Sequence, residues 1–93
     1  MSTKFENIEK ESITDLQFPG GDVLIDKDAK HQRISDLTRA QALGNLEHSK
    51  TKIYFEDDHS KKVVETTVWA VTDKRVILKK GVGIPINRIY RTI

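Results

Sequence analysis

Apolar and polar residues alternate along the second half of the chain, which is the pattern of half-buried strands. In the stretch Thr-Lys-Ile-Tyr-Phe-Glu at 51–56, Ile53 and Phe55 fall on one face, and the more polar residues fall on the other. Residues 62–72 are rich in β-branched side chains, and their apolar positions spread from one face to both toward Val71. This change predicts a long strand that bends and contributes to two layers.

Turn residues divide the rest of this half into shorter strands. The pattern predicts turns at 57–61, 72–74 and 80–81, and further strands at 75–79 and 82–86. Pro85 has no N–H to donate, so its strand is expected at a sheet edge or with the blocked nitrogen turned away from a partner. Asn87 is expected to cap a single turn before a last segment at 90–93.

One amphipathic helix is predicted at about residues 35–43. Ser35 suits the N-cap and Gly44 suits the position just after the last turn. Leu37, Ala40 and Leu43 recur three residues apart and form a narrow apolar stripe. Because so short a helix is marginal in water, the stripe must pack on the sheet. The predicted fold class is therefore α+β, with one helix packed on a strongly bent antiparallel sheet of four to five strands.

Residues 1–21 are predicted to form a weakly ordered N-terminal arm. Their apolar positions fit no continuous helical face, although a short helix could form, and Pro19-Gly20-Gly21 ends whatever precedes it. Residues 22–93 are then expected to form a single β-rich domain, with a short strand at 22–26 and a solvated loop at 26–31. Removal of residues 1–20 is expected to leave this domain largely intact.

The composition limits the classes of protein to consider. The chain has 93 residues, of which 37% are hydrophobic and 32% charged, and this is typical of one globular domain. It has no cysteine, which excludes disulfides and zinc–thiolate sites and makes a reducing, cytoplasmic location the expectation. No apolar run suits a signal peptide or a membrane span, so no membrane association is expected.

A net charge of +2 conceals an uneven distribution of charge. Residues 1–46 hold six basic and eight acidic side chains, whereas residues 47–93 hold ten basic and six acidic ones. From residue 74 onward there are six cations and no acidic residue: Lys74, Arg75, Lys79, Lys80, Arg88 and Arg91. Such a segment suits an anionic partner such as RNA or an acidic protein, but a solvated surface would give the same pattern.

Two stretches resemble known families. An apolar strand, a basic turn with glycine and the terminal IPINRIYRTI of Ile84–Ile93 resemble the end of Sm-like proteins of the Rho-binding antiterminator kind. This resemblance covers roughly residues 34–93 and implies a small Sm-like barrel and RNA binding, while closure of the barrel stays open. VTDKRVILKKG at 71–81 resembles a strand pair of bacterial pleckstrin-homology-like domains, which continue with further strands and a closing helix. The whole chain also resembles small bacterial proteins without an assigned function.

No motif in the sequence predicts an enzyme or a cofactor. FEDDH at 55–59 gathers acidic residues and a histidine, but neighbouring side chains in a hairpin turn diverge, so no metal site is expected. His31 and His48 have no serine or acid at the spacing of a catalytic triad. The glycines at 20–21 and 81–83 lack the context of a phosphate-binding or dinucleotide-binding loop.

The sequence therefore predicts a small non-enzymatic binding module. The six cations from residue 74 onward are the candidate RNA-binding or anion-binding residues, with Arg88 expected to grip a phosphate through a bidentate fork. Tyr54 and Tyr90 are the candidate platforms for base stacking, because Trp69, between Val68 and Ala70, is expected in the core. The first hypothesis is an RNA-binding module or a regulator of a nucleic-acid machine. The alternative is a protein-interaction domain that uses an exposed strand edge.

Overall fold

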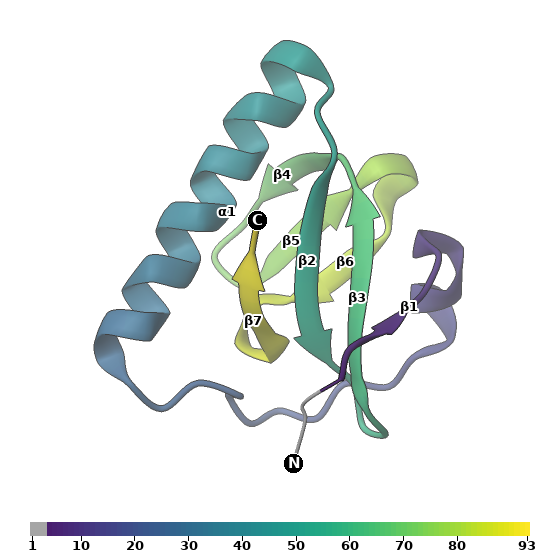
Figure 1. Ribbon diagram of the computed structural model, residues 1–93, viewed down its shortest axis with the longest axis vertical. Helices are drawn as coiled ribbons and strands as arrows, with labels where there is room; N and C mark the ends of the chain where they lie inside the picture. Colours follow the sequence, from purple (N-terminus) through teal and green to yellow (C-terminus); the bar gives the residue numbers. More distant parts are fainter. Residues whose placement is uncertain (1–3) are drawn as a thin grey trace.

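The computed structural model describes residues 4–93, which form one α-helix and two small sheets (Figure 1). Sheet A has the strand order β1-β3-β2-β7, and sheet B has the order β4-β5-β6. The elements are β1 (Glu6–Asn7), the 3-10 helix η1 (Lys10–Asp15), α1 (Lys27–Glu47), β2 (Thr51–Glu56), β3 (Lys61–Thr66), β4 (Val68–Val71), β5 (Arg75–Leu78), η2 (Lys79–Gly81), β6 (Gly83–Pro85), η3 (Ile86–Arg88) and β7 (Ile89–Thr92).

This arrangement confirms the predicted α+β class, with one long helix on small, bent sheets. The structure has two separate sheets with seven strands in residues 4–93, however, and not one sheet of four to five strands closed into a barrel. The predicted strand at 62–72 is interrupted at Thr67, so that β3 pairs with β2 while β4 pairs with β5. This part of the chain thus contributes β3 to sheet A and β4 to sheet B, as its two-sided apolar pattern indicated.

Helix α1 begins at Lys27, well before the predicted start near Ser35, so the expectations of a strand at 22–26 and a loop at 26–31 are wrong. Its N-cap is Asp26, whose carboxylate accepts a hydrogen bond of 2.9 Å from the N–H of Ala29. The first turns were missed because the buried position there is Arg33, which an apolar pattern does not register.

Gly44 lies within the helix and does not end it. It faces β4 so closely that a Cβ atom at this position would clash with the backbone oxygen of Val68. The helix ends at His48, which adopts the left-handed conformation with φ of 56° and donates its N–H to the carbonyl of Gly44 at 3.1 Å. Gly44 is therefore needed for close packing and not for termination.

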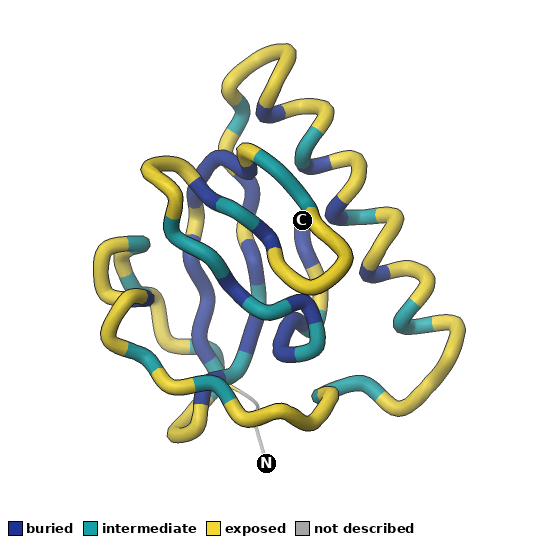
Figure 2. The backbone as a smooth tube through the Cα atoms, turned by 180° about the vertical axis from the view of Figure 1, so that it is seen from behind, coloured by how far each residue is buried: buried dark blue, intermediate teal, exposed yellow. Residues whose placement is uncertain are grey.

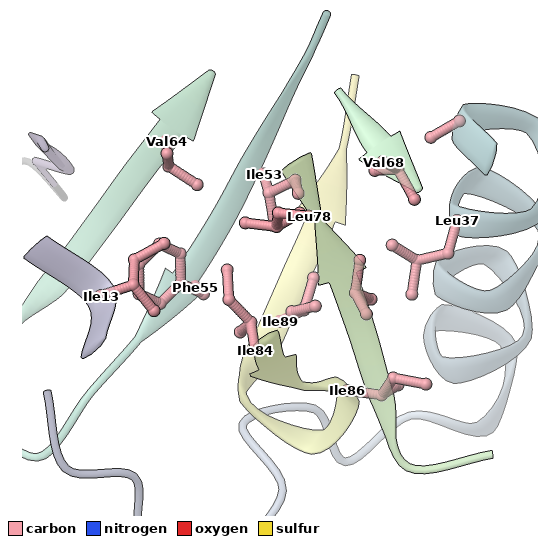
Figure 3. Close-up of a cluster of buried hydrophobic side chains, with 12 residues drawn as sticks. Ile13, Leu37, Ile53, Phe55, Val64, Val68, Leu78, Ile84, Ile86 and Ile89 are labelled. Carbon is pink, nitrogen blue, oxygen red and sulfur yellow. The ribbon is translucent and has the colours of Figure 1, made fainter. Parts of the chain in front are cut away.

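The core lies between the two sheets and is closed on two sides by other elements. Buried side chains such as Phe55 from sheet A and Leu78 from sheet B meet there with Leu37 of α1 (Figure 3). Helix α1 packs along β4 and β7, and η1 packs against β3 and β6. The inward faces of the sheets are accordingly buried, while the outward side of α1 is exposed (Figure 2).

The N-terminal segment contributes to this core. Ile13 in η1 is only 2% exposed, and Ile8, Leu16 and Phe18 pack against the buried cluster. β1 adds a short parallel pairing to β3. The expectation that the arm stands outside the core is therefore wrong for these residues, and the part of the predicted arm at residues 1–3 lies outside the described residues. In residues 4–93 no helix is long and apolar enough to cross a membrane.

Candidate nucleic-acid interface

The outer face of sheet B has cations at the start of β5 and just beyond its end. Val76 and Leu78 are fully buried and point into the core, so strand alternation turns Arg75 and Ile77 outward. Lys79, the first residue of η2, is exposed directly after the strand. Across the sheet Ile77 pairs with Gly83 of β6, and the Arg75 guanidinium lies over that glycine, where a Cβ atom would be 3.3 Å from Nη1. Because Gly83 has no side chain, the Arg75 guanidinium can lie close to the backbone of β6.

Trp69 lies on the same face and is 48% exposed. Its neighbours Val68 and Ala70 pair with Leu78 and Ile77, and the register shifts between these two pairs, so Trp69 occupies a β-bulge. Val68 and its partner Leu78 are fully buried, whereas Trp69 is exposed, so the Trp69 side chain turns away from the core. The expectation of a core tryptophan is therefore wrong, and Trp69, which the sequence offered as a stacking candidate but favoured as a core residue, returns as a functional candidate.

Two turns add cations at the ends of β5. Lys74 lies in the β4–β5 turn, which the Thr72 hydroxyl holds by accepting the N–H groups of Lys74 and Arg75 at 3.2 and 2.9 Å. Lys80 lies in the β5–β6 turn and has a left-handed φ of 69°. The side chains of both lysines are exposed. Residues 68–85 hold four cations and one acidic residue, a net charge of +3, whereas the β2–β3 hairpin at 51–66 holds three cations and four acidic residues, a net charge of −1.

Arg88 does not belong to this surface. It is 8% exposed, its Nε donates to the carbonyl of Glu56 at 3.1 Å, and its Nη1 donates to the carbonyl of Gly21 at 2.7 Å. Through these two hydrogen bonds the buried guanidinium links the N-terminal segment to sheet A. The predicted bidentate contact of Arg88 with a phosphate is therefore wrong.

Arg91 is exposed but lies on β7 in sheet A, beside α1 (Figure 1). The six predicted cations therefore divide into three groups. The first group lies at the two ends of β5 in sheet B and consists of Lys74, Arg75, Lys79 and Lys80. Arg88 is buried, and Arg91 belongs to sheet A.

Tyr54 and Tyr90 form an aromatic cluster with Phe5 on sheet A. The Phe5 ring meets them edge to face, with centroid distances of 5.0 Å to Tyr54 and 5.7 Å to Tyr90. The Tyr90 hydroxyl donates to the Glu56 carboxylate, and Lys61 Nζ lies 5.4 Å from the Tyr90 centroid. Burial, together with the Glu56 carboxylate, raises the pKa of Tyr90 to about 12. These interactions make the two tyrosines parts of the fold, so they are poorer stacking platforms than Trp69.

The acidic turn at 55–59 is organised by its own hydrogen bonds. Asp57 is 1% exposed and accepts from the N–H groups of His59 and Ser60 at 3.0 and 2.9 Å and from Lys62 Nζ at 3.0 Å. Burial acts to raise the pKa of Asp57, but the bonds from Ser60, Lys62 and His59 outweigh it and hold the pKa below its usual range. No group of three or more histidine, aspartate or glutamate side chains within residues 4–93 is placed to hold a metal ion.

No protein-family model matches the chain, and neither the comparison with characterised proteins nor that with solved structures gave a significant match. The functional argument therefore rests on the geometry and charge of the two sheets.

Proposed function

We propose that the protein is a non-enzymatic module that binds single-stranded RNA on the outer face of sheet B. The observation that carries this proposal is the exposed indole of Trp69 on a sheet face with a net positive charge. An aromatic ring can stack on the face of any base, while lysine and arginine neutralise the phosphates. This combination favours a single-stranded partner, because its bases are free to stack.

The spacing of the cations supports this role. Arg75 begins β5 and Lys79 directly follows its last residue, so the two are separated by about 13 Å, given a rise of about 3.3 Å per residue along the strand. Trp69 lies on the neighbouring strand, near the Lys79 end, where the Lys79 N–H donates to the carbonyl of Thr67 at 3.1 Å. A base stacked on Trp69 would therefore have its backbone within reach of Lys79, with Arg75 farther along the same face.

The single tryptophan of the chain provides a direct test of stacking. We expect its fluorescence to be quenched when a mixed-sequence 12-nucleotide single-stranded RNA is added to the whole protein at low salt. Trp69→Ala should weaken binding about 5-fold to 150-fold, measured by anisotropy of a labelled RNA, because loss of one stacked base costs about 1–3 kcal/mol. Tyr54→Ala is the matched control on sheet A and should leave the affinity unchanged.

The charge contribution is tested by salt dependence. Replacement of Lys79 and Lys80 with glutamine should leave the circular dichroism spectrum unchanged and reduce the slope of log K against log salt by about 0.7 for each phosphate that the variant no longer neutralises. The matched double variant, Lys52→Gln with Arg91→Gln on sheet A, should retain the wild-type slope. No binding by the wild-type protein at low salt, or equal reductions of the slope in the two double variants, would contradict the proposal.

A further inference from the structure

Strand β7 presents a free edge on sheet A, away from the proposed RNA-binding face. It pairs with β2 on one side and is the last strand of the sheet. Lys52 and Ile93 exchange both backbone hydrogen bonds, at 3.0 and 2.9 Å. In an antiparallel pair the neighbouring residue then directs its N–H and C=O away from the partner strand. Thr92 is that neighbour, so its backbone groups point outward from the sheet.

A cleft of about 410 Å³ runs along this edge. Asp36, Arg39 and Leu43 of α1 form one wall, and Thr92 and Ile93 lie on the other. Toward the start of β7 the edge is closed, because Arg33 donates to the carbonyl of Ile89 at 2.9 Å. The open part is therefore confined to the end of the strand and has a volume within the range of peptide and small-ligand sites.

Thr92 also carries a polar side-chain atom without a partner, but this atom is not open to the cleft. Thr92 is 6% exposed, and its Oγ1, which is itself buried, makes no hydrogen bond within residues 4–93. A ligand in the cleft would therefore meet the outward N–H and C=O of Thr92 and not its hydroxyl. These two backbone groups are the observation that points to a ligand with hydrogen-bonding groups.

The charge at the cleft favours an acidic ligand. Arg91 is exposed at the rim, and no ion pair in the described part of the chain involves it. Arg39 also lines the cleft, where it pairs with Asp36 at 2.6 Å while its side chain stays 63% exposed. The lining therefore holds two arginines against one aspartate.

We propose that this cleft binds an extended peptide segment of a partner protein, which adds to β7 as a strand and places an acidic side chain at Arg91. The main chain of the peptide would pair with the outward N–H and C=O of Thr92, as in strand addition at other sheet edges. This site is independent of the RNA-binding face of sheet B.

A library of random heptapeptides displayed on phage, selected on the immobilised full chain, tests this proposal. Selection against the Arg91→Glu variant removes peptides that bind elsewhere. We expect the retained peptides to carry an acidic residue, and a synthetic copy of one should bind at least 10-fold more weakly to Arg91→Glu. Lys79→Glu makes the same change of charge on sheet B and should bind this peptide as the wild type does.

A further measurement locates the peptide on the strand edge. Amide hydrogen exchange at Thr92 should slow when the selected peptide is bound. The proposal is overturned if no peptide survives the selection or if the Thr92 amide gains no protection. Concentration-dependent dimerisation that Arg91→Glu abolishes would instead assign the edge to a second copy of the chain.

Discussion

The outer faces of both sheets carry aromatic and basic residues, but the aromatic residues are packed against neighbours on sheet A and half-exposed on sheet B. On sheet A, Tyr54 and Tyr90 pack with Phe5, and the Tyr90 hydroxyl is bonded to Glu56. On sheet B, Trp69 is 48% exposed, and within residues 4–93 no aromatic pair or ion pair involves Trp69, Arg75 or Lys79.

This difference shows why residue type alone does not identify a binding surface. The aromatic residues of sheet A are held by neighbours, some of which are far away in the sequence, such as Phe5 for Tyr90. On sheet B, Arg75 lies opposite Pro85, and its guanidinium lies against Gly83. Substitutions of the packed aromatic residues on sheet A and in the core should therefore change stability, and substitutions on the outer face of sheet B should change RNA binding.

The largest contrast is expected between two aromatic truncations. Phe55 is fully buried between the sheets, so Phe55→Ala should lower the free energy of unfolding by about 3–5 kcal/mol and unfold most of the protein. Trp69→Ala, on the exposed face, should lower it by less than about 1 kcal/mol. Urea denaturation followed by circular dichroism measures both values, and a large loss in Trp69→Ala would return this side chain to the core.

The second expected effect concerns the side of the core that η1 closes. Ile13 is 2% exposed and η1 contacts both β3 and β6, so Ile13→Ala should cost about 2–4 kcal/mol. Thr14→Ala is a control in the same 3-10 helix, because Thr14 is exposed. If both variants melted at the wild-type temperature, residues 10–15 would not be part of the core, as the sequence pattern had indicated.

A pair of arginines sharpens the comparison further. Arg88→Ala removes the donors to the carbonyls of Glu56 and Gly21 and should cost about 1–3 kcal/mol, because the partly buried Glu56 carbonyl loses this donor, whereas the Gly21 carbonyl keeps the bond from Asn87 Nδ2 at 3.1 Å. Arg75→Ala, on the open face of sheet B, should change stability by less than about 0.5 kcal/mol and weaken RNA binding. Thermal melts should therefore show a loss of stability only in Arg88→Ala, and RNA titrations should show weaker binding in Arg75→Ala. Equal losses of stability in the two variants would contradict the assignment of Arg88 to the fold and Arg75 to the binding face.

The smallest expected effect is an alkaline one on sheet A. The pKa of Tyr90 is raised to about 12 in the folded protein, above the value of about 10 for a free phenol, so the fold favours the neutral form. This contribution to stability is complete below about pH 10 and is lost as the pH rises toward 12. Urea denaturation at several pH values should show this loss in the wild type and a smaller one in Tyr90→Phe. Equal losses in the two proteins would contradict the assignment.

The strands of the second half were predictable because their apolar residues alternate and their turns have characteristic residues. Thr51–Glu56 and Arg75–Leu78 lie where the pattern placed them. The start of α1 was not predictable in the same way, because its first buried position is Arg33, which is neutralised by Asp22 through bonds of 2.9 Å. Gly44 was misread as a stop because its role, close contact with β4, depends on a strand far along the chain.

The candidate site was predictable in part. The lysines and Arg75 of the β4–β5 and β5–β6 turns are exposed, as expected for residues in or next to turns. Arg88 was misassigned because its partners, Glu56 and Gly21, come from distant segments. Trp69 was misassigned because a β-bulge is a property of two paired strands, and its apolar neighbours gave no sign of the register shift.

A nuclear magnetic resonance titration of the whole protein with the mixed-sequence 12-nucleotide RNA tests the central claim most directly. The indole N–H of Trp69 gives a single signal, because the chain has one tryptophan. We predict that this signal and the amides of residues 75–80 shift at low salt and return as salt is raised, while the amides of Tyr54, Tyr90 and Arg91 stay in place. Shifts confined to sheet A, or none at all, would contradict the assignment of RNA binding to sheet B.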